Sequence, residues 1–569
     1  MIKFHKNNIQ NKYINLIYFF VILSLIVFFT RLIISANLDL SSGSFELHMD
    51  ERISFEGVKK ILHPYNVYGF SNQFFDGQNH FYGRIFWNSA AIFSYLPEKL
   101  YMNTGQIIAT RLLQYVFILM SYFIIAFGLI RWWLLRILTL LVFFSIPFAS
   151  YFFTMPKPEP LQLLFISTFI FYFVKKKAAF SNYWIFLGLA FGVKISTLPL
   201  IPFFFTISYF FNYKLITFKN IINSMMKISF PFLIGLSISV PILILPSALI
   251  ILGINVFKHF YYKQSFRKIY LIILSMIYLL FLIIYNFEVV DIWISSTLLN
   301  TAHGSDDSHI NFIHWFNYFT KEWLSGNIFM NYLLIISCIL LIFKSIHTIK
   351  TNKYFKDINF LAICILFSGI ILNLLVFLFV KRLWGHYLYI GILIFITGIL
   401  ILMDQYYFQI SSKKIKKYEY LYIFSLVFYF FFHAINYWIP QTITDLNKSA
   451  NRTKSIEYKK NLLSYNIMNN YLTKISQKRQ HILNISIDPN VFQPTNSKFL
   501  NFKEYFGEIP WSDSNDIIIL NTSNVNPKEY KKYVSSNTNL IVLNSPYFQK
   551  ITKLPNASEI LLKVNKIKI

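Results

Sequence analysis

The chain has 569 residues, of which 55% are hydrophobic, 20% aromatic and only 14% charged. A soluble domain carries about 25% charged residues, so this composition excludes a wholly soluble protein and predicts a membrane protein. The net charge of +28 resides mostly between apolar runs and in the tail. That placement favours contact with anionic lipid headgroups over nucleic-acid binding.

The apolar runs predict an all-α polytopic membrane protein with about thirteen transmembrane helices. Lysines precede the first run, 14–34, and no clear cleavage site follows it, so we interpret it as a signal anchor with a cytoplasmic N-terminus. Basic turns then assign the cytoplasmic loops by the positive-inside rule. The other single spans are predicted at 107–130, 134–152, 160–174, 269–287, 330–345, 359–380, 386–403 and 419–438.

Two segments are too long for a simple span. The segment 183–211 is interrupted near Lys194, which predicts two short helices with Lys194 near their outer turn. The segment 228–257 contains three prolines and is either one long kinked helix or a hairpin of two short helices. The hairpin is favoured because it leaves the following lysines in the cytoplasm.

The predicted topology leaves two larger outer loops, 35–105 and 288–327, and places the C-terminal segment outside. From residue 439 the sequence becomes polar, with short apolar runs that predict strands, at His481–Ile487, Asp516–Leu520, Asn539–Leu543 and Glu559–Val564. We therefore predict a transmembrane domain over 1–438 and a small soluble extracytoplasmic α/β domain over 439–569.

The first outer loop carries an acidic pair, Asp50 and Glu51, at the start of a predicted amphipathic surface helix over Glu51–Leu62. Asp50 has two interpretations. It is an N-cap, although the capping-box position holds Ile53 rather than Glu or Gln; or it is a general base at the membrane surface.

A second acidic residue, Glu159, lies among prolines where the fourth span opens. It is either a first-turn residue stabilised by the helix dipole or a functional group beside the bilayer. Lys194 and Arg382 lie near the outer face, as does His386. The two cations either reach lipid headgroups or bind a phosphate.

Weaker candidates fill the rest of the first outer loop, where polar and aromatic residues either anchor an interface or contact a substrate. They are His63, Asp76, His80, Tyr82 and Arg84. Asp306 and Asp307, with two histidines nearby, lack a fixed ligand spacing and indicate a solvated loop rather than a metal site.

The order of these motifs resembles the GT-C superfamily of glycosyltransferases, in its protein O-mannosyltransferase and lipid A aminoarabinose transferase branch. The resemblance covers roughly residues 14–403 and is best over 40–205. The chain departs from the branch at Glu159, where many relatives carry Asp, and over 228–268. The matching features are Asp50-Glu51, the aromatic loop around Arg84, Glu159, the glycine-rich stretch ending at Lys194, and Gly385-His386.

The resemblance implies transfer of a sugar from a polyprenyl-phosphate donor to an acceptor hydroxyl on the extracytoplasmic face, with inversion. It implies a base at Asp50 beside Glu51, and an orienting carboxylate at Glu159. The donor phosphate would contact Lys194, Arg382 and His386. No cofactor is certain, and a divalent metal at Asp50 and Glu159 is left open. The implied partners are membrane lipids, the donor, and a glycan, lipid or protein acceptor; the implied location is a bacterial inner or plasma membrane.

Two other classes remain as alternatives. A flippase or transporter would carry ionisable groups near the bilayer midplane and show repeated halves; the acidic candidates here lie in outer loops. A polysaccharide polymerase or ligase would be expected to carry an arginine-rich late outer loop, whereas the 288–327 loop contains no Arg.

Overall fold

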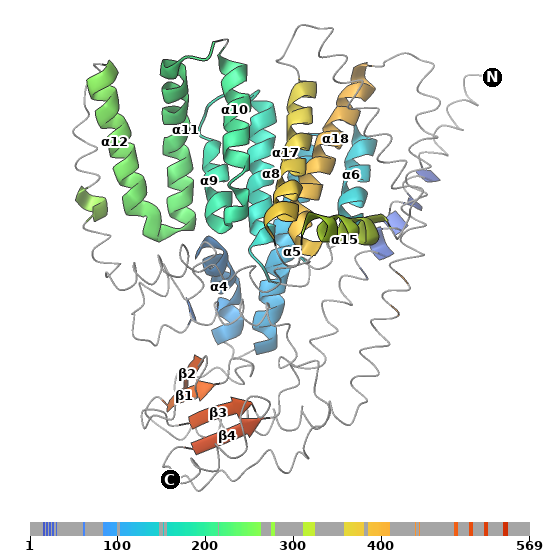
Figure 1. Cartoon of the computed structure of the whole chain (residues 1–569). Coiled ribbons are helices and arrows are strands. Elements are labelled where there is room, and N and C mark those ends of the chain that lie inside the picture. The colour runs from blue at the N-terminus through green and yellow to red at the C-terminus, as the bar shows by residue number, and fades with distance from the viewer. Residues whose placement is uncertain are drawn as a thin grey trace, which may run out of the picture. The chain divides into compact units, whose positions relative to one another are not determined.

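The computed structural model describes a mostly helical chain (Figure 1). The described residues are 84–99, 103–146, 156–213, 215–262, 311–324, 358–380, 385–409, 483–487, 500–504, 517–521 and 539–543, with isolated positions between 15 and 62 and at 152, 275–278, 439 and 443. The chain divides into two compact units. A helical unit comprises 1–32, 68–89 and 113–439, and a second unit comprises 33–67, 90–112 and 440–569.

The helical unit contains the elements that carry the candidate site. Its helices are α6 (Trp133–Ser145), α8 (Glu159–Lys175), α9 (Trp184–Val193), α10 (Leu200–Asn212), α11 (Phe218–Ser239), α12 (Ile244–Tyr262), α15 (Phe312–Leu324), α17 (Ile358–Phe379) and α18 (Tyr389–Gln409). Short 3-10 turns join some of them: η2 (Ile195–Thr197), η3 (Pro241–Leu243) and η5 (Gly385–Leu388). Two further helices, α4 (Arg84–Lys99) and α5 (Asn103–Gly128), begin in one unit and end in the other.

Several helices have the length and composition of membrane spans. Among the described residues, five segments are long and apolar enough to cross a membrane: Ile108–Gly128, Ile195–Asn212, Phe218–Ser239, Ile358–Phe379 and His386–Gln405. Shorter apolar helices accompany them at Leu135–Phe144, Trp184–Val193 and Pro241–Phe257. The predicted spans 14–34, 269–287, 330–345 and 419–438 lie outside the continuously described ranges.

Both long predicted segments are broken where the sequence suggested. The 183–211 segment forms α9 and α10, as predicted, and Lys194 ends α9 in an extended conformation (φ −155°, ψ 129°). Asn212 at the end of α10 donates to the carbonyl of Ala178, just after α8, at 3.1 Å. In the 228–257 segment, α11 and α12 meet at η3 as a hairpin rather than as one kinked helix (Figure 1).

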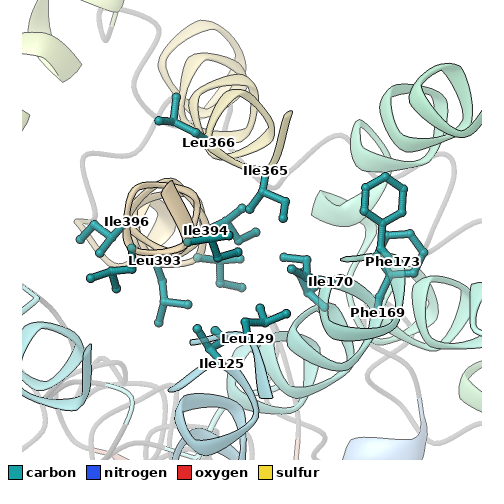
Figure 2. Close-up of a cluster of buried hydrophobic side chains, with 14 of the residues drawn as sticks. Ile125, Leu129, Phe169, Ile170, Phe173, Ile365, Leu366, Leu393, Ile394 and Ile396 are labelled. Atoms are coloured by element: carbon teal, nitrogen blue, oxygen red, sulfur yellow. The ribbon is translucent and has the colours of Figure 1, made fainter. Parts of the chain in front are cut away.

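The core of the helical unit is almost wholly apolar. Figure 2 shows a cluster formed by α5 with the residue that follows it, α8, α17 and α18; its labelled members are Ile125, Leu129, Phe169, Ile170, Phe173, Ile365, Leu366, Leu393, Ile394 and Ile396. Glycines let α17 and α18 approach closely: a Cβ placed on Gly398 would lie 2.7 Å from the carbonyl oxygen of Ala362. Small residues commonly allow such close contact between membrane helices.

The helices α9 and α11 also approach each other closely at glycines. A Cβ on Gly188 of α9 would overlap the carbonyl oxygen of Phe232 on α11, and a Cβ on Gly235 of α11 would overlap that of Ile185. The two backbones therefore pack directly against each other. This contact fixes the position of the C-terminal end of α9, and with it Lys194.

Replacing Gly188 by alanine is therefore expected to destabilise the protein by about 1–3 kcal/mol, because the added methyl must push two helix backbones apart. Gly253 of α12 provides the control, since a Cβ there would meet no atom within 4 Å. Gly253→Ala is expected to be neutral or stabilising by up to about 1 kcal/mol. Thermal unfolding of both variants in detergent measures the difference, and equal melting temperatures would contradict the close-packing argument.

The end of the bundle opposite to His386 is held by a buried carboxylate. Asp404, near the end of α18, is fully buried and accepts hydrogen bonds from the backbone N–H groups of Arg131 and Trp132 at 2.9 and 2.8 Å. Its other oxygen contacts the Arg131 guanidinium at 3.2 Å. The turn between α5 and α6, which carries Arg131, is thereby fixed to the end of α18.

The described part of the second unit includes a parallel sheet in the order β2-β1-β3-β4. Its strands are β1 (Leu483–Ile487), β2 (Leu500–Glu504), β3 (Ile517–Asn521) and β4 (Asn539–Leu543). Three of the predicted strand runs coincide with β1, β3 and β4. The β2 strand was not predicted, because this edge strand alternates apolar with polar or charged residues and has no continuous apolar run. The predicted run Glu559–Val564 lies outside the described residues.

Candidate functional site at the start of helix α8

Prolines determine where α8 begins. Pro158 is the N-cap and Glu159 is the first helical residue, followed by Pro160. Proline is tolerated in the first turn, because the N–H groups there have no partner within the helix. The carboxyl group of Glu159 consequently lies at the positive end of the α8 dipole, and the residue is only 5% exposed.

Lys194 is the direct partner of this carboxylate. Its ammonium group donates to Oε1 of Glu159. The side chains are 15% and 6% exposed, respectively, so the pair is largely shielded from solvent. The contact forms because the turn from α9 to α10 packs on the first turn of α8.

Two more potential cations act on the same carboxylate. Burial raises the pKa of Glu159, but Lys194, Lys157 and His386 together outweigh burial and lower this pKa to about 2. Glu159 precedes the predicted span 160–174 and is ionised at neutral pH. A carboxylate with so low a pKa is a weak proton acceptor, so it is better suited to orient a ligand than to remove a proton.

The second carboxylate oxygen of Glu159, Oε2, is also buried and has no hydrogen-bond partner among the described residues. Burying an acceptor without a hydrogen-bond partner costs folding free energy, so such an atom needs an explanation other than stability. This oxygen can accept a hydrogen bond from the hydroxyl group of a ligand.

The η5 turn contributes the aromatic side of the site. The ring of Tyr387 lies 5.4 Å from Nζ of Lys194, in a cation–π arrangement. The His386 ring packs edge-on against Phe152 at 5.9 Å, and Phe152 packs on Tyr389 at 4.8 Å. These contacts connect η5 to the aromatic core.

Two tyrosines anchor the start of α18, which directly follows η5 in the chain. The hydroxyl groups of Tyr389 and Tyr122 are hydrogen-bonded to each other, and the Tyr122 hydroxyl also contacts the carbonyl of Phe143 at 3.2 Å. Both tyrosines are fully or almost fully buried. The position of His386 and Tyr387 is therefore set by packing on α5 and α6.

The structure brings together three residues that the sequence singled out: Glu159, Lys194 and His386. It adds one contact that the sequence did not predict, the ion pair between Lys194 and Glu159. Arg84 is the first residue of α4 and is buried. The other predicted site residues lie outside the described residues: Asp50, Glu51, His63, Asp76, His80, Tyr82 and Arg382.

One buried polar residue of the site was missed in the sequence. Gln162 lies one helical turn after Glu159, is 1% exposed, and contacts the α9–α10 turn. The signal that could have found it is an amide in an otherwise apolar span, on the same helix face as Glu159.

No protein-family model and no curated protein matches the sequence. Within the described ranges, no three His, Cys, Asp or Glu side chains gather as they would to hold a metal ion. A metal shared by Asp50 and Glu159 involves a residue outside those ranges.

Proposed function

We propose that this chain is a GT-C-type membrane glycosyltransferase. It moves a sugar from a polyprenyl-phosphate donor to an acceptor hydroxyl on the extracytoplasmic face, with inversion at the anomeric carbon. The observation that carries the proposal is the buried, ionised Glu159 between Lys194, Lys157 and His386 at one end of a bundle of membrane-type helices.

The proposal includes the finer architecture predicted from the sequence. It comprises about thirteen spans, a cytoplasmic N-terminus, a C-terminal extracytoplasmic α/β domain, and a place in a bacterial inner or plasma membrane. Helix direction is consistent with this topology. The helices α8 and α18 both begin at the Glu159 end of the bundle. Their other ends lie near Lys175 and Asp404, where the positive-inside rule places the cytoplasm.

The chemistry requires a base and a cationic region. The acceptor oxygen attacks the anomeric carbon, the bond from that carbon to the phosphate oxygen breaks, and the electron pair leaves with the polyprenyl phosphate. The phosphate is already a weak base, so no strong general acid is needed. The proton of the acceptor hydroxyl passes to the proposed base, Asp50.

The cations of the site fit the departing phosphate. Lys157 and Lys194 both act on Glu159, so the site gathers positive charge beside the bilayer. Cations placed where negative charge develops are a large contribution to catalysis. Arg382 lies four residues before His386 in the chain and would add to this charge. Glu159 would orient the acceptor hydroxyl through its second oxygen.

The experiment that tests the proposal is transfer by purified protein in lipid nanodiscs, supplied with a panel of polyprenyl-phosphate sugars and candidate glycan, lipid and protein acceptors. The expected result is a mass increase of one sugar residue on an acceptor, absent with heat-denatured protein. Addition of many residues in one step would indicate a polymerase or ligase.

A flippase assay separates the transporter alternative. In proteoliposomes, a fluorescent lipid-linked sugar is expected to cross the bilayer no faster than in protein-free vesicles. Rapid crossing without any transfer would overturn the enzyme proposal in favour of transport.

A further inference from the structure

Gln162 makes an unusually dense set of contacts for a residue inside an apolar helix. The nitrogen of its side-chain NH₂ group lies 3.2 Å from the carbonyl oxygen of Lys194, 3.0 Å from Oγ of Ser196 and 2.5 Å from Oγ1 of Thr197, so its two hydrogens are shared among three acceptors. All three acceptors belong to the turn between α9 and α10. The Gln162 amide therefore joins α8 to this turn.

The orientation of the amide follows from its partners. The backbone carbonyl of Lys194 can only accept, so the amide group facing it must be the NH₂ group. The Thr197 hydroxyl donates its own hydrogen to the carbonyl of Ala190 at 3.2 Å, which leaves its oxygen to accept from Gln162. The amide oxygen of Gln162 has no partner among the described residues. The amide thus acts here as a donor.

The turn that Gln162 holds carries a break in helical geometry. The backbone N–H of Lys194 still bonds to Ala190 at 3.1 Å, but the residue itself is extended, and η2 follows it. The carbonyl of Lys194 accepts from the Gln162 side chain. Helix α8 accordingly contacts Lys194 at two points, Glu159 at its ammonium group and Gln162 at its carbonyl.

We propose that Gln162 is a positioning residue, which holds the backbone of Lys194 in the extended conformation that places the ammonium group between Glu159 and the η5 turn. A lysine side chain has many rotamers, so a fixed backbone greatly reduces the volume its ammonium group can sample. The consequence for sugar transfer depends on the proposed function; the consequence for Lys194 does not.

The first arm of the test measures Lys194 directly. Purified protein is treated with an acetylating N-hydroxysuccinimide ester, and the rate at Lys194 is measured by peptide mass spectrometry against the exposed Lys176. We expect Gln162→Met, which keeps the length and removes the donors, to raise the relative rate at Lys194 at least threefold. Thr197→Val, which removes only one acceptor, should give a smaller rise.

Ser167→Ala is the matched control, since Ser167 is a buried polar residue of the same helix with no hydrogen-bond partner among the described residues. In this variant the relative acetylation rate at Lys194 should equal that of the wild type. If Gln162→Met does not fold, the labelling rate at Lys194 in Thr197→Val tests the positioning role instead. An unchanged rate at Lys194 in the folded variant would overturn the positioning role.

The second arm uses transfer. In Gln162→Met we expect the KM for the polyprenyl-phosphate donor to rise about tenfold, with a smaller change in kcat, because a displaced Lys194 binds the donor phosphate less well. Loss of kcat at an unchanged donor KM would contradict the role. If the wild type transfers no sugar at all, the proposed function fails, while the labelling arm still tests Gln162.

Discussion

Replacing either proposed carboxylate by its amide, as Asp50→Asn or Glu159→Gln, is expected to reduce sugar transfer at least a hundredfold, because Asp50 is the proposed base and Glu159 the proposed orienting group for the acceptor hydroxyl. Asp50→Asn removes the group that is proposed to take the acceptor proton, and it should leave expression and membrane insertion intact. Glu159→Gln keeps the shape of the side chain but leaves Lys194 without its counter-charge. Initial transfer rates per folded molecule measure both effects.

A third carboxylate provides the control. Asp404 is buried like Glu159, but it lies near the C-terminal end of α18, away from the candidate site. There it binds the backbone of the α5–α6 turn. Asp404→Asn retains an acceptor oxygen and should keep the transfer rate per folded molecule near that of the wild type. Full activity in Asp50→Asn would remove Asp50 from the mechanism, and full activity in Glu159→Gln would reduce its pair with Lys194 to a structural contact.

The sequence could predict Glu159, Lys194 and His386 because ionisable residues beside apolar runs are rare and stand out. It could not predict that Glu159 and Lys194 form a pair. Their contact depends on the register between α8 and the α9–α10 turn, which long-range packing sets, including the glycine contact of α9 with α11. Pairing across such distances in the chain leaves no periodic signal.

The helix α15 shows a second limit of the sequence. The segment 288–327 was predicted as an outer loop, yet Phe312–Leu324 within it is helical. Trp315 anchors this helix: it is fully buried and donates from Nε1 to the carbonyl of Val380, just after α17, at 2.6 Å. The same ring stacks on Phe377. Tertiary contacts of this kind stabilise a short helix whose sequence alone reads as a polar, aromatic loop.

The ion pair itself makes the second large prediction, which concerns stability. Removing one partner of a buried pair leaves an uncompensated charge and typically costs about 3–5 kcal/mol, whereas removing both is often neutral. Lys194→Met is expected to fall at the low end of that range, because Lys157 and His386 still face Glu159. Glu159→Gln removes the carboxylate that pairs with Lys194 and should also destabilise the protein.

The double variant Glu159→Gln/Lys194→Met should then be more stable than the less stable single variant, since it buries neither charge. Apparent melting temperatures of the wild type, both single variants and the double variant form a double-mutant cycle, which isolates the coupling between the two side chains. Additive losses would mean that Glu159 and Lys194 are independent. Recovery of stability without recovery of transfer would separate the two roles, because the folded protein would then lack only the charges that the phosphate and the acceptor hydroxyl are proposed to meet.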